Sequence, residues 1–216
     1  PYTQGSQMQN IGSMESKGWE FEVGGDIIRT KDFTWSSSMN LSHNTGKILT
    51  LEGDNSYHNG NGFVAPGTPG DAARMEAGST IGSFYMWKFA GFDDEGSFLL
   101  YNKDGEVIPA AQKTENDKQY IGNYTPKLII GWSHTLTYKN FDLGINLRSW
   151  IDFDVYNTIN MYYGIQGQGN LNVLKDAYGK FNHIKGEKQI CDYFLEDGTF
   201  LKIDAITLGY TLPMKK

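Results

Sequence analysis

Residues 126–155, PKLIIGWSHTLTYKNFDLGINLRSWIDFDV, carry the pattern that decides the fold. Apolar and polar residues alternate up to the pair Lys139-Asn140, and the alternation resumes after it. The apolar positions are Leu128, Ile130, Trp132, Leu136 and Tyr138 before the pair, and Phe141, Leu143, Ile145, Leu147, Ile151 and Phe153 after it. A period of two residues is typical of a strand with one apolar and one polar face. We therefore predict a long β-hairpin with strands at about 126–138 and 141–155.

The arms of this hairpin are longer than most strands, which usually run about five or six residues. At roughly 3.3 Å per residue, a tilted strand of about 9–11 residues crosses the hydrocarbon core of a bilayer. No apolar run in the sequence reaches the length of about 18 residues that a membrane helix needs. A spanning structure would therefore be a β-barrel, the other fold that satisfies every backbone group in lipid.

Composition agrees with an all-β chain and excludes several other classes. The 216 residues include 26 glycines, 13 tyrosines and 5 tryptophans, as expected for many turns and interfacial rings. The formal net charge of -6 does not suit a nucleic-acid-binding protein, which would present a basic face. Cys191 is the only cysteine, so the chain forms no internal disulfide and holds no metal site built from paired cysteines.

Three further strands are predicted by the same alternation. Strands at about 17–29 and 33–43 form a second long hairpin around a turn at 30–32. A fifth strand at about 199–211 changes its apolar phase, from Leu201 and Ile203 to Ile206, Leu208 and Tyr210. This change predicts either a β-bulge or a strand that is buried on both faces.

Two long segments, at about 46–125 and 156–197, separate these strands. In the first, we predict a short helix from Asp71 to Gly78, and a small hairpin that joins 97–101 to 106–108. In the second, apolar residues at helical spacing follow a candidate cap at Asn170 and predict another helix. We interpret both segments as folded loops rather than as structureless connections.

Long and short connections alternate along the chain. In a meander, successive connections lie at opposite ends of the sheet, so the long ones share one side. An outer-membrane barrel has this asymmetry, with short periplasmic turns and long extracellular loops. The aromatic residues near the predicted short turns fit an interfacial girdle; they are Phe33, Trp35, Tyr138, Phe141 and Tyr210. The predicted fold class is a segment of a large antiparallel transmembrane β-barrel.

The sequence also resembles a known family. The resemblance lies in GSMESKGWEFEVGGDIIRTKDFTWSSSMNLSHN (12–44), IGSFYMWKFAGF (81–92), PKLIIGWSHTLTYKNFDLGINLRSW (126–150) followed by DVYN, and FLKIDAITLGYTLP (200–213). These segments are similar, in the same order, to the C-terminal barrel region of SusC/RagA-type TonB-dependent outer-membrane transporters of Bacteroidetes. No plug, TonB-contacting segment or signal peptide matches here, so we expect a fragment of a longer polypeptide.

The resemblance implies a location, partners and a function. It implies import of glycans or peptides across the outer membrane of a Gram-negative bacterium. It also implies a SusD-like surface lipoprotein as partner, and the TonB complex, which would act through a plug domain absent from this chain. The segment would supply barrel wall and external loops in contact with outer-membrane lipid.

Candidate site residues fall into two groups. Arg148, Asp152 and Asp154 are predicted to face the lumen, because charged side chains are costly on the lipid side. Aromatic residues among Asn and Gln neighbours in the long loops are candidates for substrate binding; they are Tyr57, Tyr85, Trp87, Tyr162 and Tyr163. Packing within the folded loops is the alternative role for each of these rings.

No catalytic, metal or cofactor motif is recognisable. The four histidines, His43, His58, His134 and His183, lie far apart in the sequence and form no zinc-binding pair. Scattered carboxylates are the only support for a glycan-cleaving enzyme, so we predict that the chain is not an enzyme. The principal alternative is a soluble or cell-surface β-sandwich that binds carbohydrate, since it too would show alternating strands and aromatic loops.

Overall fold

The computed structural model describes residues 10, 12–51, 57–59, 71–166 and 172–213. The chain divides into two compact units. The sheet unit contains Lys17–Thr45, Thr125–Val155 and Asp197–Lys216, and the loop unit contains Pro1–Ser16, Gly46–Tyr124 and Tyr156–Glu196. Among the helices in these described ranges, none has the length and apolar character needed to cross a membrane.

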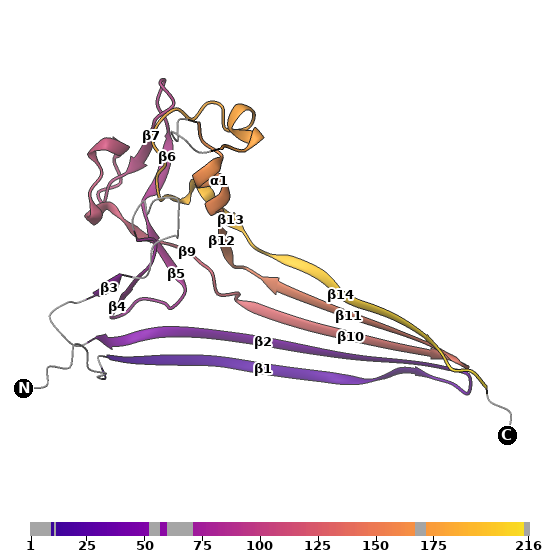
Figure 1. The fold of residues 1–216 in the computed structure, drawn as a ribbon. Helices are drawn as coiled ribbons and strands as arrows, with labels where there is room; N and C mark the ends of the chain where they lie inside the picture. The colour runs from indigo at the N-terminus through magenta and orange to yellow at the C-terminus, as the bar shows by residue number, and fades with distance from the viewer. Residues whose placement is uncertain (1–9, 11, 52–56, 60–70, 167–171, 214–216) are drawn as a thin grey trace, which may run out of the picture. The chain divides into compact units, whose positions relative to one another are not determined.

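Five long strands form one sheet (Figure 1). They are β1 (Gly12–Arg29), β2 (Phe33–Leu51), β10 (Leu128–Tyr138), β11 (Phe141–Ile151) and β14 (Phe200–Tyr210), in the order β1-β2-β10-β11-β14. From β2 to β14, neighbouring strands of the sheet pair antiparallel. β1 and β2 reach further than the predicted ranges, whereas β11 ends before the predicted residue 155. The break follows from Asp152, whose φ of 57° places it in a left-handed conformation that asparagine and aspartate tolerate better than other non-glycine residues.

The register of β10 against β11 confirms the predicted hairpin. Tyr138 pairs with Phe141 at the turn, and Leu128 pairs with Ile151 at the far end. Residues directly opposite each other lie on the same face, so the alternating apolar positions of the two strands coincide. Lys139 has a φ of 53° in the two-residue turn, as a tight hairpin requires.

A β-bulge explains the phase change in β14. Leu147 pairs with Ile203 and Asn146 pairs with Ala205, which leaves Asp204 as the extra residue. The bulge returns Ile206, Leu208 and Tyr210 to the face that carries Leu201 and Ile203. Of the two alternatives that the sequence left open, the bulge is therefore confirmed.

The two faces of this sheet differ sharply in character. We call one the apolar face; its exposed large side chains are Trp19, Phe21, Val23, Ile27, Trp132, Tyr138, Phe141, Leu201, Ile203, Ile206, Leu208 and Tyr210. Leu208 is 75% exposed and Ile206 is 62% exposed. Soluble monomers rarely expose a contiguous apolar surface larger than a few hundred Å². This face therefore needs a nonaqueous environment or a covering partner.

Polar atoms on the apolar face pair with one another. The indole N–H of Trp35 donates to Nδ1 of His134 at 3.3 Å, and the indole N–H of Trp132 donates to Oγ of Ser37 at 2.8 Å. The rings of Trp132 and His134 are 4.5 Å apart between centroids. Because each hydrogen bond stays within the face, these polar groups can leave water at a reduced cost.

The short connections meet at one end of the sheet. The backbone N–H of Lys139 donates to the carbonyl of Asp32 at 2.9 Å, and that of Thr211 donates to the carbonyl of Asn140 at 2.8 Å. The rings of Phe141 and Tyr210 lie 4.6 Å apart beside these turns. The turns that follow β1 and β10 therefore lie at the same end of the sheet.

The loop unit consists of short strands and single helical turns. Its strands are β3 (Tyr57–Asn59), β4 (Arg74–Glu76), β5 (Ser83–Met86), β6 (Lys88–Phe92), β7 (Phe98–Tyr101), β8 (Val107–Pro109) and β9 (Gln119–Asn123), while β12 (Asp154–Tyr156) pairs with β13 (Leu195–Asp197) at the boundary of the units. The helical segments are α1 (Thr158–Tyr163) and the 3₁₀ turns η1 (Ala110–Gln112), η2 (Glu115–Asp117), η3 (Lys175–Tyr178) and η4 (Asp192–Phe194).

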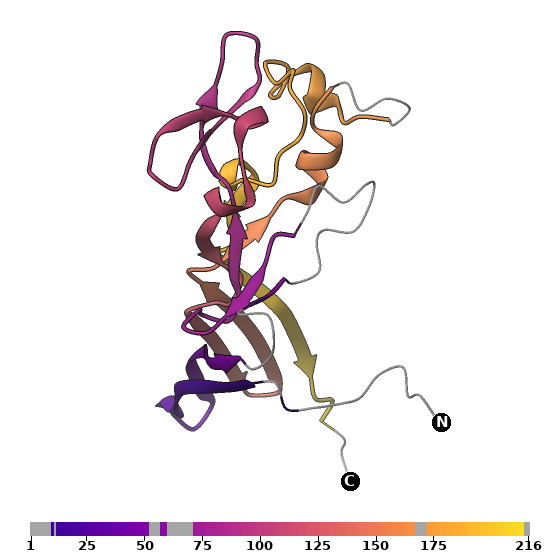
Figure 2. The ribbon, with the colours of Figure 1, turned by 90° about the vertical axis from the view of Figure 1, so that its left-hand side faces the viewer.

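The two long segments share one hydrophobic core, which the sequence did not predict. Met86, Phe98 and Leu100 from the first pack with residues such as Met161 and Ile190 from the second, and all five are almost fully buried. Backbone hydrogen bonds also join the segments, including the N–H of Trp87 to the carbonyl of Ile190 at 3.2 Å. Figure 2 shows the two segments side by side within this unit.

The local predictions for these segments had mixed outcomes. The small hairpin is confirmed by β7 and β8, with Tyr101 opposite Val107. The helix from Asp71 to Gly78 was wrong, because residues 74–76 pair with β3 and Gly78 takes a φ of 93° in a turn. The helix cap at Asn170 lies outside the described residues, and within the described stretch 172–181 the chain forms the 3₁₀ turn η3.

Replacing Phe98 with Ala tests this shared core. Phe98 is 1% exposed and contacts the rings of Phe89, Phe92, Tyr193 and Phe194. The loss of a buried ring and the cavity left behind should lower the free energy of unfolding of the loop unit by about 3–5 kcal/mol. The measurement is the urea concentration at which a protease begins to cleave the loop unit in a whole receptor that carries this chain.

A matched control for this test is Tyr178→Ala, because Tyr178 is 70% exposed in the same unit. The free energy of unfolding obtained from its cleavage midpoint should stay within about 0.5 kcal/mol of the parent value. Equal shifts for the two variants would contradict a core centred on Phe98.

Candidate functional site

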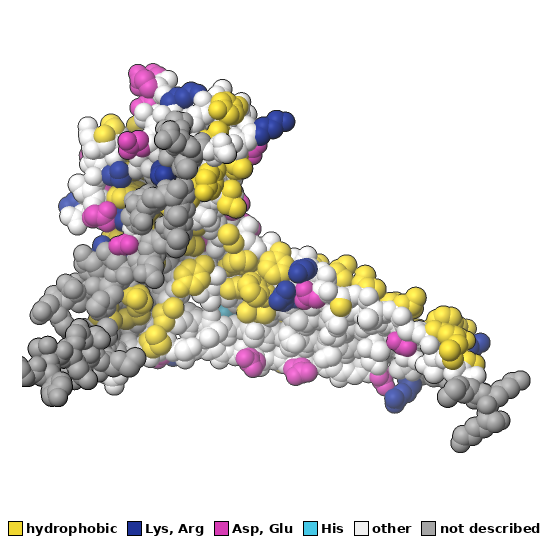
Figure 3. Space-filling model, in the orientation of Figure 1, with side chains coloured by type: hydrophobic (Ala, Val, Ile, Leu, Met, Phe, Trp, Pro, Cys, Tyr) yellow, Lys and Arg dark blue, Asp and Glu magenta, His cyan; other side chains and the backbone are white. Residues whose placement is uncertain are grey.

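The polar face of the five-stranded sheet is lined mainly by small hydroxyl and amide side chains. One row across it consists of Ser38, Ser133, Asn146 and Ala205, which are register partners on four successive strands. Threonine and serine residues follow this row toward the short turns, for example Thr135 opposite Ser36. Figure 3 shows a broad stretch of white polar side chains and backbone over these strands. Such a surface suits contact with water or with a polar solute.

On part of this face, side chains of neighbouring strands lie directly over the backbone of glycine residues. Oδ1 of Asn40 accepts a hydrogen bond from the backbone N–H of Gly131 at 3.0 Å, so the amide lies across the neighbouring strand. A Cβ atom at position 131 would be 2.6 Å from that oxygen, which only glycine avoids. A Cβ at Gly144 would similarly lie 2.8 Å from the hydroxyl of Thr207.

A charged group interrupts the neutral surface. Arg148 and Lys202 are register partners on β11 and β14, and Asp204 is the bulged residue beside them. Nη2 of Arg148 lies 3.3 Å and Nζ of Lys202 lies 3.6 Å from the same carboxylate oxygen of Asp204. The bulge therefore directs Asp204 to the side of the sheet that holds both cations.

The other two predicted lumen residues lie beyond the regular strand. Asp152 follows the end of β11 and forms an exposed ion pair with Lys127 at 2.6 Å. Asp154 begins β12. Because the alternation stops at Ile151, it places Arg148 on the polar face but does not decide the side of Asp152 or Asp154.

Aromatic rings gather next to the charged group. Trp150 and Phe200 are register partners one row beyond Arg148 and Lys202, with ring centroids 5.6 Å apart. Phe153 lies 5.9 Å from Trp150 between centroids, and the guanidinium carbon of Arg148 lies 5.7 Å from the centre of the Trp150 ring. In Figure 3, a blue and magenta group adjoins a yellow patch over the long strands. We call Arg148, Trp150, Phe200, Lys202 and Asp204 the basic–aromatic cluster.

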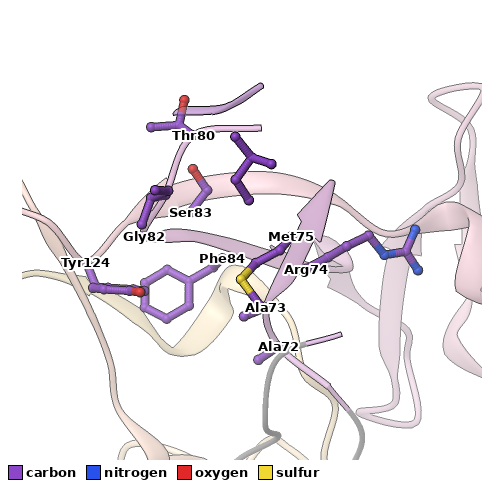
Figure 4. A pocket seen from close by; sticks show the side chains of 11 residues that line it. Ala72, Ala73, Arg74, Met75, Thr80, Gly82, Ser83, Phe84 and Tyr124 are labelled. Carbon is purple, nitrogen blue, oxygen red and sulfur yellow. The ribbon is translucent and has the colours of Figure 1, made fainter. Parts of the chain in front are cut away.

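The loop unit contains a second candidate site, a cavity of about 370 Å³ that we call the loop pocket. Its walls include Ile48, Ala72, Met75, Ile81 and Phe84, with Tyr124 beside Phe84. The rings of Phe84 and Tyr124 meet edge to face, 5.8 Å apart. Figure 4 shows these two rings together and the guanidinium of Arg74 directed away from them. The sequence did not single out this pocket, because its walls come from residues far apart in the chain.

The structure places most of the predicted loop aromatics in the core. Tyr85, Trp87 and Tyr162 are buried, and Trp87 is only 4% exposed. The indole N–H of Trp87 donates to the carbonyl of Thr114 at 2.8 Å, and Lys118 Nζ lies 4.4 Å from its ring centre. These contacts favour the packing role for the three buried rings.

The other two rings are placed differently. Tyr163 is partly buried at the end of α1 and packs against the core, and Tyr57 lies in β3 opposite Glu76. Tyr163 is not among the described residues that line the loop pocket.

Hydrogen bonds and burial shift several titratable groups of the loop unit. The side chain of Thr114, with backbone N–H groups of Thr114 and Lys103, holds the pKa of Asp117 below its usual value. Burial raises the pKa of Tyr120 to about 12, with a further rise from Glu76. Tyr120 therefore stays protonated at neutral pH, and its hydroxyl donates to the carbonyl of Arg74 at 3.4 Å.

Metal binding finds no support in the described part of the chain. No group of three or more histidine, cysteine, aspartate or glutamate side chains lies close enough there to hold an ion. His43 and His134 of the sheet unit are engaged in hydrogen bonds, His43 with the carbonyl of Lys127 and His134 with Trp35.

Comparisons with known proteins agree on one family. The chain is 28% identical to TonB-dependent receptor P3 of Formosa agariphila over 96% of its length, and 29% identical to TonB-dependent receptor SusC of Bacteroides thetaiotaomicron over 94%. The chain is similar to TonB-dependent receptors, SusC among them. The predicted resemblance and the outer-membrane location in a Gram-negative bacterium are thereby confirmed. No family model matches the chain.

Solved structures support the barrel fold. The chain matches a structure of the RagAB peptide transporter with a TM-score of 0.73 and 23% identity, and the RagAB peptide importer in the open-open state with a TM-score of 0.72 and 24% identity. Each match covers 96% of this chain, but 24% and 23% of the respective solved chains. The predicted fold class, a segment of a large antiparallel barrel, is confirmed.

The chain spans only part of its relatives. It covers 23% of the length of receptor P3 and 21% of that of SusC. The five described strands of the sheet accordingly form an open segment with β1 and β14 at its edges.

Cys191 should be unreactive in the folded protein. The residue is fully buried, and burial raises the pKa of its thiol to about 12. At pH 8 only about one thiol in ten thousand would then be the reactive thiolate, against roughly a quarter in an unfolded chain. Labelling with a maleimide at pH 8 should be negligible before, and complete after, denaturation in urea. Fast labelling of the folded protein would contradict the burial of Cys191.

Proposed function

We propose that this chain forms part of the wall and external loops of an outer-membrane transporter for nutrients. In this proposal the apolar face contacts lipid and the polar face lines a water-filled lumen. The observation that carries it is the exposed apolar face, which runs along all five long strands opposite a face of small polar residues. That division is characteristic of outer-membrane barrels with polar interiors.

Strand dimensions support the same proposal. β10, β11 and β14 each contain 11 residues, enough for a tilted strand to cross the hydrocarbon region. The paired indole and imidazole groups of the apolar face lower the cost of placing them in lipid. A soluble β-sandwich would instead bury one face of this sheet against a second sheet.

We propose that the long segments lie outside the cell and that the short turns lie in the periplasm. Tyr57 and Tyr163 are the predicted aromatics that we retain for direct contact with a substrate, and Tyr85, Trp87 and Tyr162 would hold the loops in shape. Arg148 would face the lumen, and Asp152 and Asp154 would follow the end of β11 that is remote from the short turns. The imported substrate would be a glycan or a peptide, since both remain compatible with these surfaces.

The similarity to TonB-dependent receptors also suggests which partners the whole receptor would have. We propose a SusD-like surface lipoprotein over the external side, and energy coupling by the TonB complex through a plug supplied by another part of the receptor. This chain would contribute no catalytic group. The solved RagAB structures are described as a peptide transporter, which motivates peptides as one of the two substrate classes.

Adjacent cysteine substitutions test the orientation of the sheet. Ile145 pairs with Ile206 on the apolar face, whereas Asn146 pairs with Ser133 on the polar face. In a whole receptor within intact outer membranes, Asn146→Cys should react with a membrane-impermeant maleimide, and Ile145→Cys should be protected by lipid.

The pair is its own control, because the two positions are neighbours in β11 and share the same local backbone. The parent protein provides the background, in which Cys191 should remain silent. Strong labelling at Ile145 in folded barrels would contradict the proposal.

A further inference from the structure

The basic–aromatic cluster combines two kinds of contact on one patch of the polar face. Arg148 and Lys202 form one row of the β11–β14 pair, and Trp150 and Phe200 form the next row on the same side. A solute on this patch would therefore meet cationic donors and flat apolar rings within two residues of each other. Both strands belong to the sheet unit, so the patch is a single local structure.

The charges of the cluster do not balance. Asp204 contacts both Arg148 and Lys202, which leaves one positive charge in excess. The side chain of Lys202 is 60% exposed and that of Arg148 is 43% exposed. An incoming carboxylate could reach both cations by competing with Asp204.

Arg148 retains unused donors within the described structure. A guanidinium carries five N–H groups in a planar fork that matches a carboxylate. Within the described residues, Nη2 donates to Asp204 at 3.3 Å, and Nε has no hydrogen-bond partner. The single long contact shows that Asp204 does not use the full capacity of this group.

The residues that flank the charged row of the cluster carry no charge. Toward the short turns, the next residues on the face are Asn146 and Ala205, which carry no charge. The aromatic row on the other side offers surfaces against which apolar side chains or the CH face of a sugar ring can stack. Charge selection on this patch therefore falls to Arg148, Lys202 and Asp204.

We propose that the basic–aromatic cluster binds a carboxylate of the transported substrate, with the adjoining apolar part of that substrate against Trp150 and Phe200. This inference rests on the proposed function and narrows it to substrates that bear a carboxylate beside an apolar surface. A uronate-containing oligosaccharide and a peptide with a free C-terminus share that chemistry. A segment of the receptor itself that docks in the lumen is the competing occupant.

The test measures the affinity of a whole purified receptor for matched pairs of probes by calorimetry. Trigalacturonate is compared with neutral maltotriose, and trialanine with its C-terminal amide. At least one carboxylate probe should bind about tenfold more tightly than its neutral counterpart. The pair that shows this preference identifies the source of the carboxylate, and absence of any preference at millimolar probe overturns the inference.

Three substitutions should change the preference for carboxylate probes in opposite directions. Arg148→Gln and Lys202→Gln should each remove most of it, because each deletes a cationic donor. Asp204→Asn should strengthen carboxylate binding severalfold, because it removes the competing anion. If Asp204 were needed only to hold the cluster in shape, its loss would weaken binding instead, and that result would overturn the inference.

Lys139→Gln is the matched control, since it removes the same charge in the short turn beside Asp32. It should leave the preference unchanged. Heat-modifiable gel mobility reports barrel assembly for every variant, and the exposed Lys202→Gln carries the test if Arg148→Gln does not assemble. Probe binding could instead stay unchanged in all cluster variants while the protease sensitivity of the lumen changes. This result would show that the cluster binds a segment of the receptor itself, and it would overturn the inference.

The outcome is separable from that of the proposed function. If the transporter proposal is wrong, Ile145→Cys reacts with the membrane-impermeant maleimide, and this result does not depend on how the carboxylate and neutral probes bind. With the expected labelling pattern but no carboxylate preference, the wall assignment stands and only the substrate inference falls.

Discussion

The structure depends on removing one face of its long sheet from water. The apolar face carries large side chains on every strand, and several, such as Leu208 and Ile206, are more than half exposed. Where polar atoms occur on that face, they bond within it, as Trp35 does with His134 and Trp132 with Ser37. Lipid satisfies this constraint without any further protein layer, which accounts for the length of the strands and for the polar character of the opposite side.

The bulge that keeps the apolar face continuous also changes the polar face. The bulge at Asp204 keeps the apolar residues of β14 on a single face although their spacing in the sequence changes. The same bulge directs an extra carboxylate to the polar face, where it meets Arg148 and Lys202. A feature that keeps the apolar residues on one face thus also creates the charged group of the polar face.

The sequence predicted those elements whose partners are close along the chain. The hairpin at 126–155 followed from alternation and a two-residue turn. The phase change at 203–206 allowed either a bulge or a strand buried on both faces, and the register decides for the bulge. Pairing between distant segments was not predictable in this way. Residues 74–76 looked helical but pair with β3, and the core around Phe98 forms only when two segments separated by β10 and β11 meet. For the same reason, Trp87 and Tyr162 appeared as loop aromatics but lie buried.

The division into a lipid-facing and a water-facing side is the central claim of this account. Its most direct test is quenching of tryptophan fluorescence by bromine atoms on lipid acyl chains, in vesicles that contain a whole receptor with this chain. Trp132 lies on the apolar face and Trp150 on the polar face, so Trp132→Phe should remove part of the quenchable emission and Trp150→Phe should leave that part unchanged. Loss of quenchable emission with Trp150→Phe, but not with Trp132→Phe, would contradict the assignment of the two faces.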